Sequence, residues 1–484
     1  MAKVILVDPR GWQGAANGQV PFPNVGIAYL IPLLRQQGND VRVIDLNNEA
    51  ITNKKVLEII EEYKPDIVGL SVKTSTMKDA RSLSKQIKDT FPGIHIILGG
   101  PHTKFEYNKL ITEPWFDSIF VGEGEYILPV VCAAVASGNP MQQIDGVVTK
   151  NSLKKDFCLE QTLINGTQLD SLPFPEYDLF PQNVRNSIRT AYPIVTSRGC
   201  VYNCSYCSVP EVSGKGFRKR SPENVVKELN WARQKYGATG FWIIDDVFNL
   251  DIKRSKEICR AIIHANLNMI WSCPNGLRAD RVDPELAGLM FESGCRSVSV
   301  GVESADPDIL KTVKKGETIE DIEKGIRIFK ESGIDVNGFF IVGLPGDSFR
   351  AEERSVEFVK KMGIGALFNM LVPYPGTAYW EWAKTNAIFL SDPEDSLHFA
   401  NDRDKVKSVI ETDDFPASGR EKAFEMVNTR LENFGVLVPK NIPLHRHIYL
   451  IVRLLWIYDR RHLISYIPKK IVHKIQKLIK NKQV

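Results

Sequence analysis

Three cysteines in one short run are the residues of this chain best suited to carry chemistry. Cys200, Cys204 and Cys207 follow the spacing Cys-x3-Cys-x2-Cys. Three thiolates at this spacing can hold an iron–sulfur cluster and leave one iron without a protein ligand. A cluster with an open iron favours catalysis over electron storage.

Other uses of these cysteines fit less well. Structural zinc normally takes four protein ligands, and the remaining cysteines stand singly, at positions 132, 158, 259, 273 and 295. Eight cysteines in 484 residues are also too sparse for a disulfide framework. The first eight residues are typical of a strand and not of a signal peptide. We therefore expect a cytoplasmic protein with an iron–sulfur cluster.

The cysteine run, with Tyr206 just before its last cysteine, resembles the signature of the radical S-adenosylmethionine (SAM) enzymes. The resemblance implies that Cys200, Cys204 and Cys207 bind three irons of a [4Fe-4S] cluster. It also implies that the fourth iron binds the amino and carboxylate groups of SAM. One-electron reduction of SAM then yields methionine and a 5′-deoxyadenosyl radical.

The N-terminal third shows short apolar runs that alternate with amphipathic stretches. The pattern predicts strands at 4–7, 40–44, 67–71, 94–98 and 118–121, and helices at 25–37, 54–63 and 77–90. Buried strands separated by helices indicate an α/β, Rossmann-like domain over residues 1–145, with a parallel sheet covered on both faces. Ligands of such sheets bind at the carboxyl ends of the strands.

Three loops at those strand ends are rich in small and polar residues. Glycine lets the backbone approach a ligand closely, and hydroxyl groups can bind it through hydrogen bonds. A plain turn is an equal interpretation of any one loop, and the three together favour a binding site. The candidate residues are Ser71, Lys73, Thr74, Gly99, Gly100, Pro101, Gly122, Glu123, Gly124 and Glu125.

Two of these loops, at 98–102 and 121–125, resemble those of the cobalamin-binding domain of cobalamin-dependent radical SAM enzymes. The histidine motif Asp-x-His-x-x-Gly of many other cobalamin proteins is missing, since neither His95 nor His102 matches it. The resemblance thus implies cobalamin without a histidine below the metal. Because Lys73 lies in the loop of the third strand, we hypothesise that it approaches the lower face of cobalt.

A proline-rich linker, 146–190, leads to a second alternation of strands and helices. Strands are expected at 192–196, 240–244, 269–273, 297–302, 336–342 and 366–371, and helices at 222–236, 253–265, 284–293, 319–332 and 351–362. Six such units predict a partial (β/α)6 TIM-like barrel over 191–390, with its active site at the carboxyl ends of the strands. The cysteines follow the first of these strands.

Polar residues follow several of the barrel strands. They are Asp245, Asp246, Arg278, Glu303 and Ser304. The family resemblance implies that the two aspartates lie near the methionine amino group, that Glu303 lies near the ribose, and that Gly343 allows close approach to adenine. Arg278 can pair bidentately with a carboxylate, such as that of methionine. Helix caps, surface ion pairs and, for Gly343, a plain turn are the alternatives.

The C-terminal region, 391–484, is predicted to be helical with a basic tail. Residues 440–484 carry eleven Lys and Arg and one acid, whereas the whole chain has a net charge of only +4. An apolar stretch at 448–458 is too short to span a bilayer of about 30 Å. The amphipathic tail can bind anionic lipid, as a peripheral contact on the inner membrane face, or cover the barrel. No nucleic-acid partner is expected, because no binding module accompanies the charge.

The sequence therefore predicts a cobalamin-dependent radical SAM enzyme, with a [4Fe-4S] cluster, SAM and cobalamin as cofactors. We expect methyl transfer to an unactivated carbon of a small-molecule or lipid substrate. The expected electron donor is a protein such as flavodoxin or ferredoxin. Radical oxidation, cyclisation or ring rearrangement is an alternative within the same cofactor class. A cluster-bearing electron-transfer or binding protein is an alternative from a different class.

Overall fold

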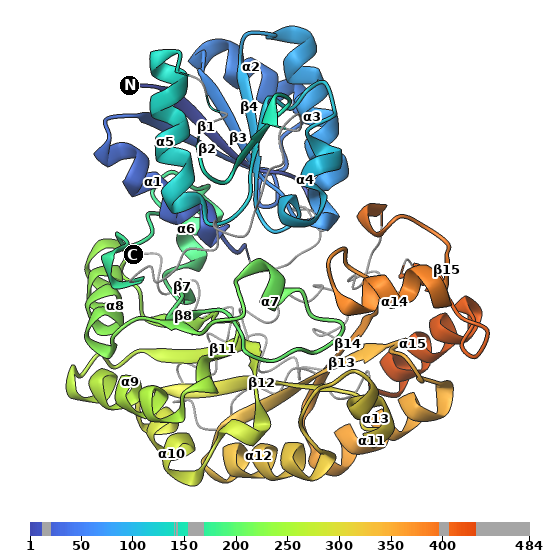
Figure 1. The fold of residues 1–484 in the computed structure, drawn as a ribbon. Helices are drawn as coiled ribbons and strands as arrows, with labels where there is room; N and C mark the ends of the chain where they lie inside the picture. The colour runs from blue at the N-terminus through green and yellow to red at the C-terminus, as the bar shows by residue number, and fades with distance from the viewer. Residues whose placement is uncertain (12–20, 140, 142–143, 153–168, 396–405, 432–484) are drawn as a thin grey trace, which may run out of the picture.

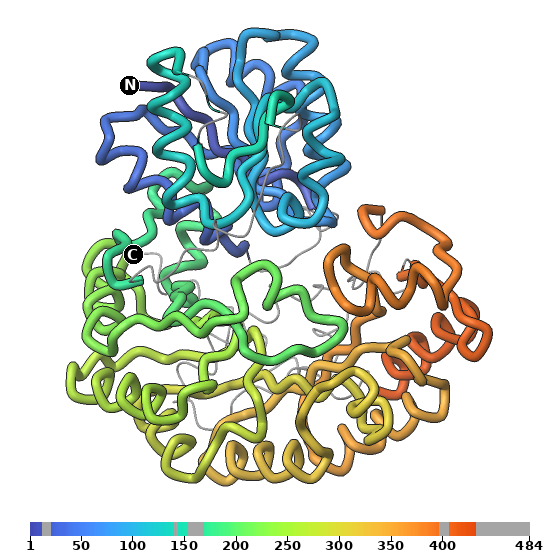
Figure 2. Tube along the Cα trace, viewed as in Figure 1, coloured from blue at the N-terminus to red at the C-terminus, as the bar shows by residue number. Residues whose placement is uncertain are grey.

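The computed structural model describes residues 1–11, 21–139, 141, 144–152, 169–395 and 406–431. They form two α/β units, each built on one six-stranded sheet (Figure 1). The N-terminal unit lies against the side of the second unit that carries the cysteine loop (Figure 2). The predicted α/β class, the Rossmann-like first domain and the partial barrel are confirmed.

The N-terminal sheet has the strand order β2-β1-β3-β4-β5-β6 and is parallel except for β6, which pairs antiparallel with β5. Its elements are β1 (Lys3–Asp8), α1 (Val25–Gln36), β2 (Asp40–Asp45), α2 (Asn53–Tyr63), β3 (Ile67–Ser71), α3 (Met77–Thr90), β4 (His95–Gly99), α4 (Thr103–Leu110), β5 (Ser118–Phe120), α5 (Gly124–Ser137) and β6 (Val147–Thr149). The sheet thus extends past the expected boundary at residue 145, because β6 adds an edge strand.

Alternation along β1 explains why this sheet is covered on both faces. Leu6 packs in one apolar cluster with Ile31 of α1, and Val7 packs in another with Leu83 of α3. Successive strand residues point to opposite faces, so a continuous apolar run needs helices on both sides. Figure 1 shows α1 and α5 on one face and α2 and α3 on the other.

The second sheet has the order β14-β13-β12-β11-β10-β7, and its pairs are all parallel. Helices line the outer side of this open barrel (Figure 1). Its strands and outer helices are β7 (Tyr192–Ile194), α8 (Pro222–Tyr236), β10 (Gly240–Ile243), α9 (Ile252–His264), β11 (Ile270–Leu277), α10 (Pro284–Glu292), β12 (Cys295–Glu303), α12 (Ile319–Glu331), β13 (Asp335–Val342), α13 (Phe349–Met362) and β14 (Gly365–Met370).

Short elements absent from the sequence prediction build the surroundings of the cysteines. The strands β8 (Ser197–Arg198) and β9 (Arg218–Lys219) form an antiparallel ribbon, and α7 (Val209–Val212) lies between them in sequence. Further elements are α6 (Gln182–Ser187), α11 (Pro307–Thr312), α14 (Ala378–Asn386), β15 (Ile388–Phe389), β16 (Ile410–Glu411), α15 (Ala417–Leu431), and short 3₁₀ turns, among them η6 (Phe248–Leu250) and η8 (Pro393–Asp395).

Residues 169–190, within the described part of the linker, contact both units. Tyr177 is fully buried beside Tyr192 and Tyr236, and the backbone N–H of Glu176 donates to the carbonyl of Ala28. The linker thus contacts the second unit through aromatic rings and the N-terminal unit through a backbone hydrogen bond, and both contacts help to fix the relative position of the two units.

The predicted basic tail lies outside the described residues. In the part of the chain that is described, no helix is long and apolar enough to cross a membrane.

Candidate functional site

The cysteine loop leaves the barrel after β7 and returns through β9. Cys200 is buried, while Cys204 and Cys207 are half-buried, and all three thiols are free. The backbone N–H of Cys207 donates to the carbonyl of Cys204 at 3.1 Å, which tightens the turn between them. Two neighbours hold Ser205: its N–H donates to Val313, and its carbonyl accepts from Tyr379.

The donor chemistry of this loop fits an iron–sulfur cluster. Among the described residues, no three Cys, His, Asp or Glu side chains converge on a single metal ion. A four-iron cluster needs a different arrangement, because each thiolate binds its own iron. Burial raises the pKa of Cys204 and raises that of Cys207 to about 12, so the free thiols stay protonated. Metal binding deprotonates a coordinating thiol.

Tyr206 and Glu303 meet beside the cysteine loop. The phenol of Tyr206 forms a hydrogen bond with the carboxylate of Glu303, and Lys315 Nζ donates to Glu303 Oε1 at 2.9 Å. Glu303 follows an irregularity in the pairing of β12 with β13 and has φ +68°, a strained conformation for this residue type. Burial alone lowers the pKa of Lys315, but Glu303 and Glu317 raise it above its usual value.

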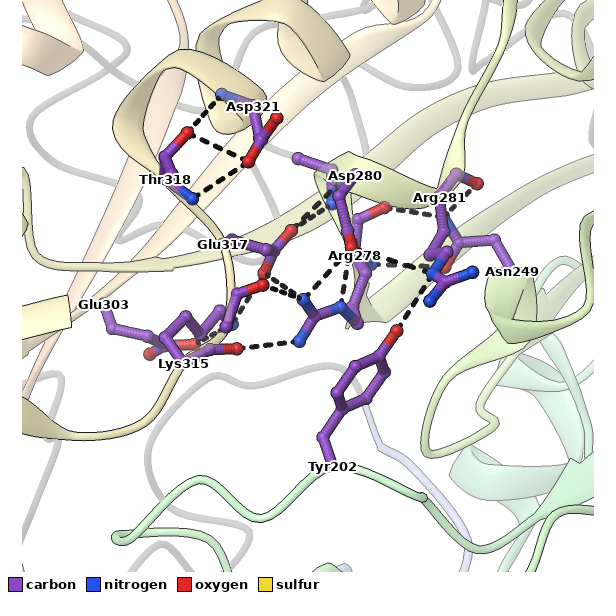
Figure 3. A network of polar contacts seen from close by, with 12 residues as sticks. Tyr202, Asn249, Arg278, Asp280, Arg281, Glu303, Lys315, Glu317, Thr318 and Asp321 are labelled. Atoms are coloured by element: carbon purple, nitrogen blue, oxygen red, sulfur yellow. Dashed lines mark hydrogen bonds and ion pairs between the residues drawn. The ribbon is translucent and has the colours of Figure 1, made fainter. Parts of the chain in front are cut away.

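Arg278 is occupied by the protein itself, which corrects the expected pairing with the methionine carboxylate. Its Nε donates to Asp280 at 2.8 Å, and its two terminal nitrogens donate to the carbonyls of Lys315 and Gly316 (Figure 3). The guanidinium also stacks on the ring of Tyr202 at 3.5 Å. These contacts leave no pair of N–H groups free for a second bidentate partner. Arg278 instead fixes the loop that carries Lys315.

Asp245 accepts hydrogen bonds from the cysteine loop, whereas contact with the methionine amino group was expected. Oδ1 accepts from the backbone N–H of Thr196, and Oδ2 accepts from the hydroxyls of Thr196 and Ser197. Both oxygens of this buried carboxylate therefore hold the start of the cysteine loop and are not directed to a methionine amino group. Asp246 accepts from the N–H of Gly199 at 2.8 Å and lines a pocket. It remains a candidate for contact with SAM.

Ser304 and Gly343 both have a role in the local structure. The hydroxyl of Ser304 accepts from the N–H of Asp306. Gly343 has φ +97°, and a Cβ there would lie 2.6 Å from Arg420, whose guanidinium donates to the Gly343 carbonyl. The turn explains this glycine without a contact to adenine.

A pocket of about 360 Å³ lies between the N-terminal unit and the cysteine loop. The N-terminal unit supplies five glycines to it, and the barrel unit supplies Ser197, Arg198, Val212, Ser213 and Asp246. At Gly100, with φ +103°, a Cβ would lie 2.6 Å from the Val72 carbonyl oxygen, so only glycine fits there. A wall built from glycines suits a broad, flat ring system such as cobalamin. The five glycines are Gly26, Gly69, Gly100, Gly122 and Gly124.

Most of the predicted loop residues line this pocket: Ser71, Lys73, Gly100, Pro101, Gly122, Glu123, Gly124 and Glu125. Two do not. Thr74 is buried with its hydroxyl 3.1 Å from His102 Nδ1, and Gly99 makes room for the Phe120 ring, which a Cβ would meet at 1.8 Å. Both therefore support the loops and do not face a ligand.

Glu123 and Glu125 contact the other unit, so their side chains are not free for a cofactor. Glu123 accepts from Arg198 and Arg218, and Glu125 accepts from Arg198 at 2.6 Å. Glu123 is the N-cap residue of α5 and Glu125 lies in its first turn, where the helix dipole favours negative charge.

Sequence reasoning missed several residues of the site. Lys315, Glu317 and Tyr202 join the Arg278 network (Figure 3). Lys104 lines the pocket; its Nζ is buried without a hydrogen-bond partner, and burial lowers its pKa. Two sequence features could have indicated these residues: Tyr202 lies inside the cysteine run, and Lys104 lies just after the Gly99–Pro101 turn.

Two family models match this chain in the same order as its two units. Residues 14–131 match the B12 binding domain, and residues 194–359 match the radical SAM superfamily.

Curated relatives cover most of the chain. An uncharacterized methyltransferase of Pyrococcus horikoshii is 33% identical over 372 residues, which are 76% of this chain and 80% of that protein. The anaerobic magnesium-protoporphyrin IX monomethyl ester cyclase of Rubrivivax gelatinosus is 27% identical over 77% of this chain and 68% of its own length.

The fold matches that of a solved enzyme over its full length. The radical SAM methyltransferase TsrM from Kitasatospora setae, with cobalamin and a [4Fe-4S] cluster bound, superposes with a TM-score of 0.71. The match covers 99% of this chain and 100% of that one at 18% sequence identity.

Proposed function

This chain belongs to the cobalamin-dependent radical SAM enzymes, and from that membership we propose that it methylates an unactivated carbon of its substrate. One observation carries the proposal. The glycine-lined pocket opens between the cobalamin-domain loops and the cysteine loop, so a cofactor of each unit would face the same space. The relative from Pyrococcus horikoshii, a methyltransferase, supports transfer of a methyl group as the reaction.

The side chains divide the work of this site. Cys200, Cys204 and Cys207 would hold the cluster, and the glycines of the pocket would hold cobalamin. When bound, the cluster and SAM supply a carbon-centred radical, and cobalamin supplies a methyl group. The chain's own contribution is to position these groups and to exclude water from the space between them.

For SAM, we propose contacts with Tyr206, Asp246 and Glu303. Tyr206 belongs to the cysteine loop and forms a hydrogen bond with Glu303. Asp246 accepts a hydrogen bond from the N–H of Gly199 and lines the pocket. Lys315 neutralises one oxygen of Glu303 and so fixes the rotamer of Glu303 beside the cysteine loop.

The test is anaerobic reconstitution with iron, sulfide and hydroxocobalamin, followed by mass spectrometry of products from small-molecule and lipid extracts. A product heavier by one methylene unit, formed together with S-adenosylhomocysteine, is expected. The Cys204→Ala protein is the control and should form neither. A wild-type protein that binds both cofactors and yields 5′-deoxyadenosine without a methylated product would contradict methyl transfer.

Radical cyclisation is the second candidate, because the relative from Rubrivivax gelatinosus is a cyclase. The same experiment separates the two reactions. A cyclised product loses hydrogen without gaining a methylene unit, and S-adenosylhomocysteine does not accumulate.

We propose a small one-electron donor protein, such as flavodoxin or ferredoxin, as the partner that reduces the cluster. Its replacement by chemical dithionite should support turnover at a different rate with the same products. A product that forms without any reductant would exclude this partner.

We further propose that the basic tail, 440–484, makes a peripheral contact with anionic lipid. The whole chain and a chain ending at residue 440 would be co-sedimented with vesicles that contain anionic phospholipid. Equal sedimentation of the two proteins would contradict the contact.

A further inference from the structure

We propose that four charged residues, Glu123, Glu125, Arg198 and Arg218, position the cysteine loop against the cobalamin domain and thereby set the separation of the two cofactors. We call these residues the interdomain bridge. The inference rests on the proposed function, since it concerns how the two cofactor sites of that reaction are held in register.

The β8–β9 ribbon places two positive charges directly opposite each other. In its antiparallel register Arg198 pairs with Arg218, and Ser197 pairs with Lys219. Like charges directly opposite on a strand pair repel and destabilise the pairing. The ribbon has only two residues in each strand, so few backbone bonds oppose this repulsion. It therefore needs a negative partner.

That partner comes from the other domain. Arg218 holds Glu123 bidentately, with nitrogen–oxygen distances of 2.9 and 2.5 Å, and Arg198 Nη1 lies 3.1 Å from the same carboxylate. Glu123 thus lies between the two arginines and neutralises the repulsion. Paired planar groups of this kind hold both distance and orientation.

Glu125 and Tyr29 complete the setting of Arg198. The guanidinium donates to Glu125 at 2.6 Å and lies over the Tyr29 ring at 5.3 Å. The four side chains are 6–20% exposed, so their pairing is little screened by solvent.

The bridge joins the two segments whose relative position matters for the reaction. Arg198 lies two residues before Cys200, and the ribbon closes the loop that carries all three cysteines. On the other side, Glu123 directly follows Gly122, which lines the pocket with φ +126°. A shift of the bridge would move the cysteine loop relative to the cobalamin-domain loop.

A second interdomain ion pair offers a matched control. Lys78 of α3 contacts Asp395 of η8 at 2.7 Å, but the two side chains are 78% and 48% exposed. Exposed pairs contribute little. Lys78→Met therefore removes an ion pair between the N-terminal unit and the segment that follows the barrel, without disturbing the ribbon.

The first experiment uses the protein without cofactors and measures hydrogen–deuterium exchange. Glu123→Gln leaves Arg198 and Arg218 opposed, so amides in 197–219 should exchange about tenfold faster, while Lys78→Met should leave them unchanged. Adding Arg218→Met to Glu123→Gln removes the repulsion and should restore most of the protection. Equal exchange in wild type and Glu123→Gln, or no recovery in the double variant, would overturn the role of Glu123.

The second experiment uses protein loaded with cluster and cobalamin. The magnetic interaction between the reduced cluster and cob(II)alamin, measured by electron paramagnetic resonance, should weaken in Glu123→Gln and not in Lys78→Met. The yield of 5′-deoxyadenosine per methylated product should rise about tenfold, because misplaced reacting groups lose effective concentration. An unchanged spin interaction at full loading would overturn the proposal. A wild-type protein that makes no methylated product would count against the proposed function alone, since the exchange and spin measurements still report on the bridge.

Discussion

The interdomain bridge and the Arg278 network at the barrel mouth are both built from acidic side chains paired with basic ones, but they join different parts of the molecule. The network of Arg278, Asp280, Lys315, Glu317 and Glu303 lies wholly within the barrel (Figure 3). The bridge takes its acids from one domain and its bases from the other. Charged residues next to strand ends can therefore have two roles. If the partner of opposite charge comes from the same domain, the pair shapes one site; if it comes from the other domain, the pair holds two sites in register.

The largest effect on the reaction is expected from loss of the cluster, which both the bridge and the Arg278 network serve to position. Cys204→Ala removes a cluster ligand, so SAM cleavage should fall below detection, whereas hydroxocobalamin should still bind the N-terminal domain. Quantification of 5′-deoxyadenosine under reducing, oxygen-free conditions, with absorbance titration of the cobalamin, checks both parts. Retained SAM cleavage would show that the cluster is held elsewhere.

Arg278→Met should separate the network from the bridge. It leaves the carbonyls of Lys315 and Gly316 without their donor and removes the positive charge 3.7 Å from the buried carboxylate of Glu317, which costs about 3 kcal/mol of stability. SAM cleavage should fall together with methylation, whereas Glu123→Gln should lower methylation only. Urea unfolding and product quantification provide the two measurements. Equal ratios of 5′-deoxyadenosine to methylated product in the two variants would show that the Arg278 network and the interdomain bridge act on the same step.

Asp245→Asn tests whether a carboxylate beside the cysteine loop binds SAM or supports the loop. The amide turns one acceptor into a donor that faces Thr196 or Ser197, at a cost of about 2 kcal/mol. We expect a lower iron content and an unchanged KM for SAM in the protein that keeps its cluster. A higher KM at full iron content would favour direct contact with SAM.

Lys73→Ala should have the smallest effect. Lys73 is exposed at the pocket, so the free energy of unfolding should change by less than about 0.5 kcal/mol. If its amine approaches the lower face of cobalt, the electronic spectrum of bound hydroxocobalamin should shift. An identical spectrum in wild type and variant would reject that hypothesis.

The sequence predicted the secondary structure closely because strands and helices follow local periodicity. The helix expected at 222–236 is α8, and the helix expected at 77–90 is α3. Short elements were missed where periodicity has no room to develop, as in β8, β9 and α7. The edge strand β6 was missed for another reason: it pairs antiparallel with β5 and so lies outside the alternation of parallel strands and helices on which the prediction rested.

The sequence predicted the cluster loop of the site but not the ion pairs and hydrogen bonds around it, because these depend on residues far apart in the chain. Cysteine spacing is local, so the cluster loop was found. The partners of Arg278 and Asp245 come from loops up to 49 residues away, and the sequence does not indicate which charges meet. For the same reason, the sequence named Glu123 and Glu125 as cofactor-binding candidates but did not indicate that they pair with Arg198 and Arg218.

The opposed arginines of the β8–β9 ribbon limit how far this protein can be divided or recombined. A barrel excised at residue 191 would keep all six strands of its sheet, yet it would lose the only acid placed between those two arginines in the part of the chain described. A chimaera that joins this barrel to a cobalamin domain from another enzyme inherits the same deficit unless that domain brings a carboxylate at the start of its last helix. The two domains can therefore be transferred to another enzyme only together.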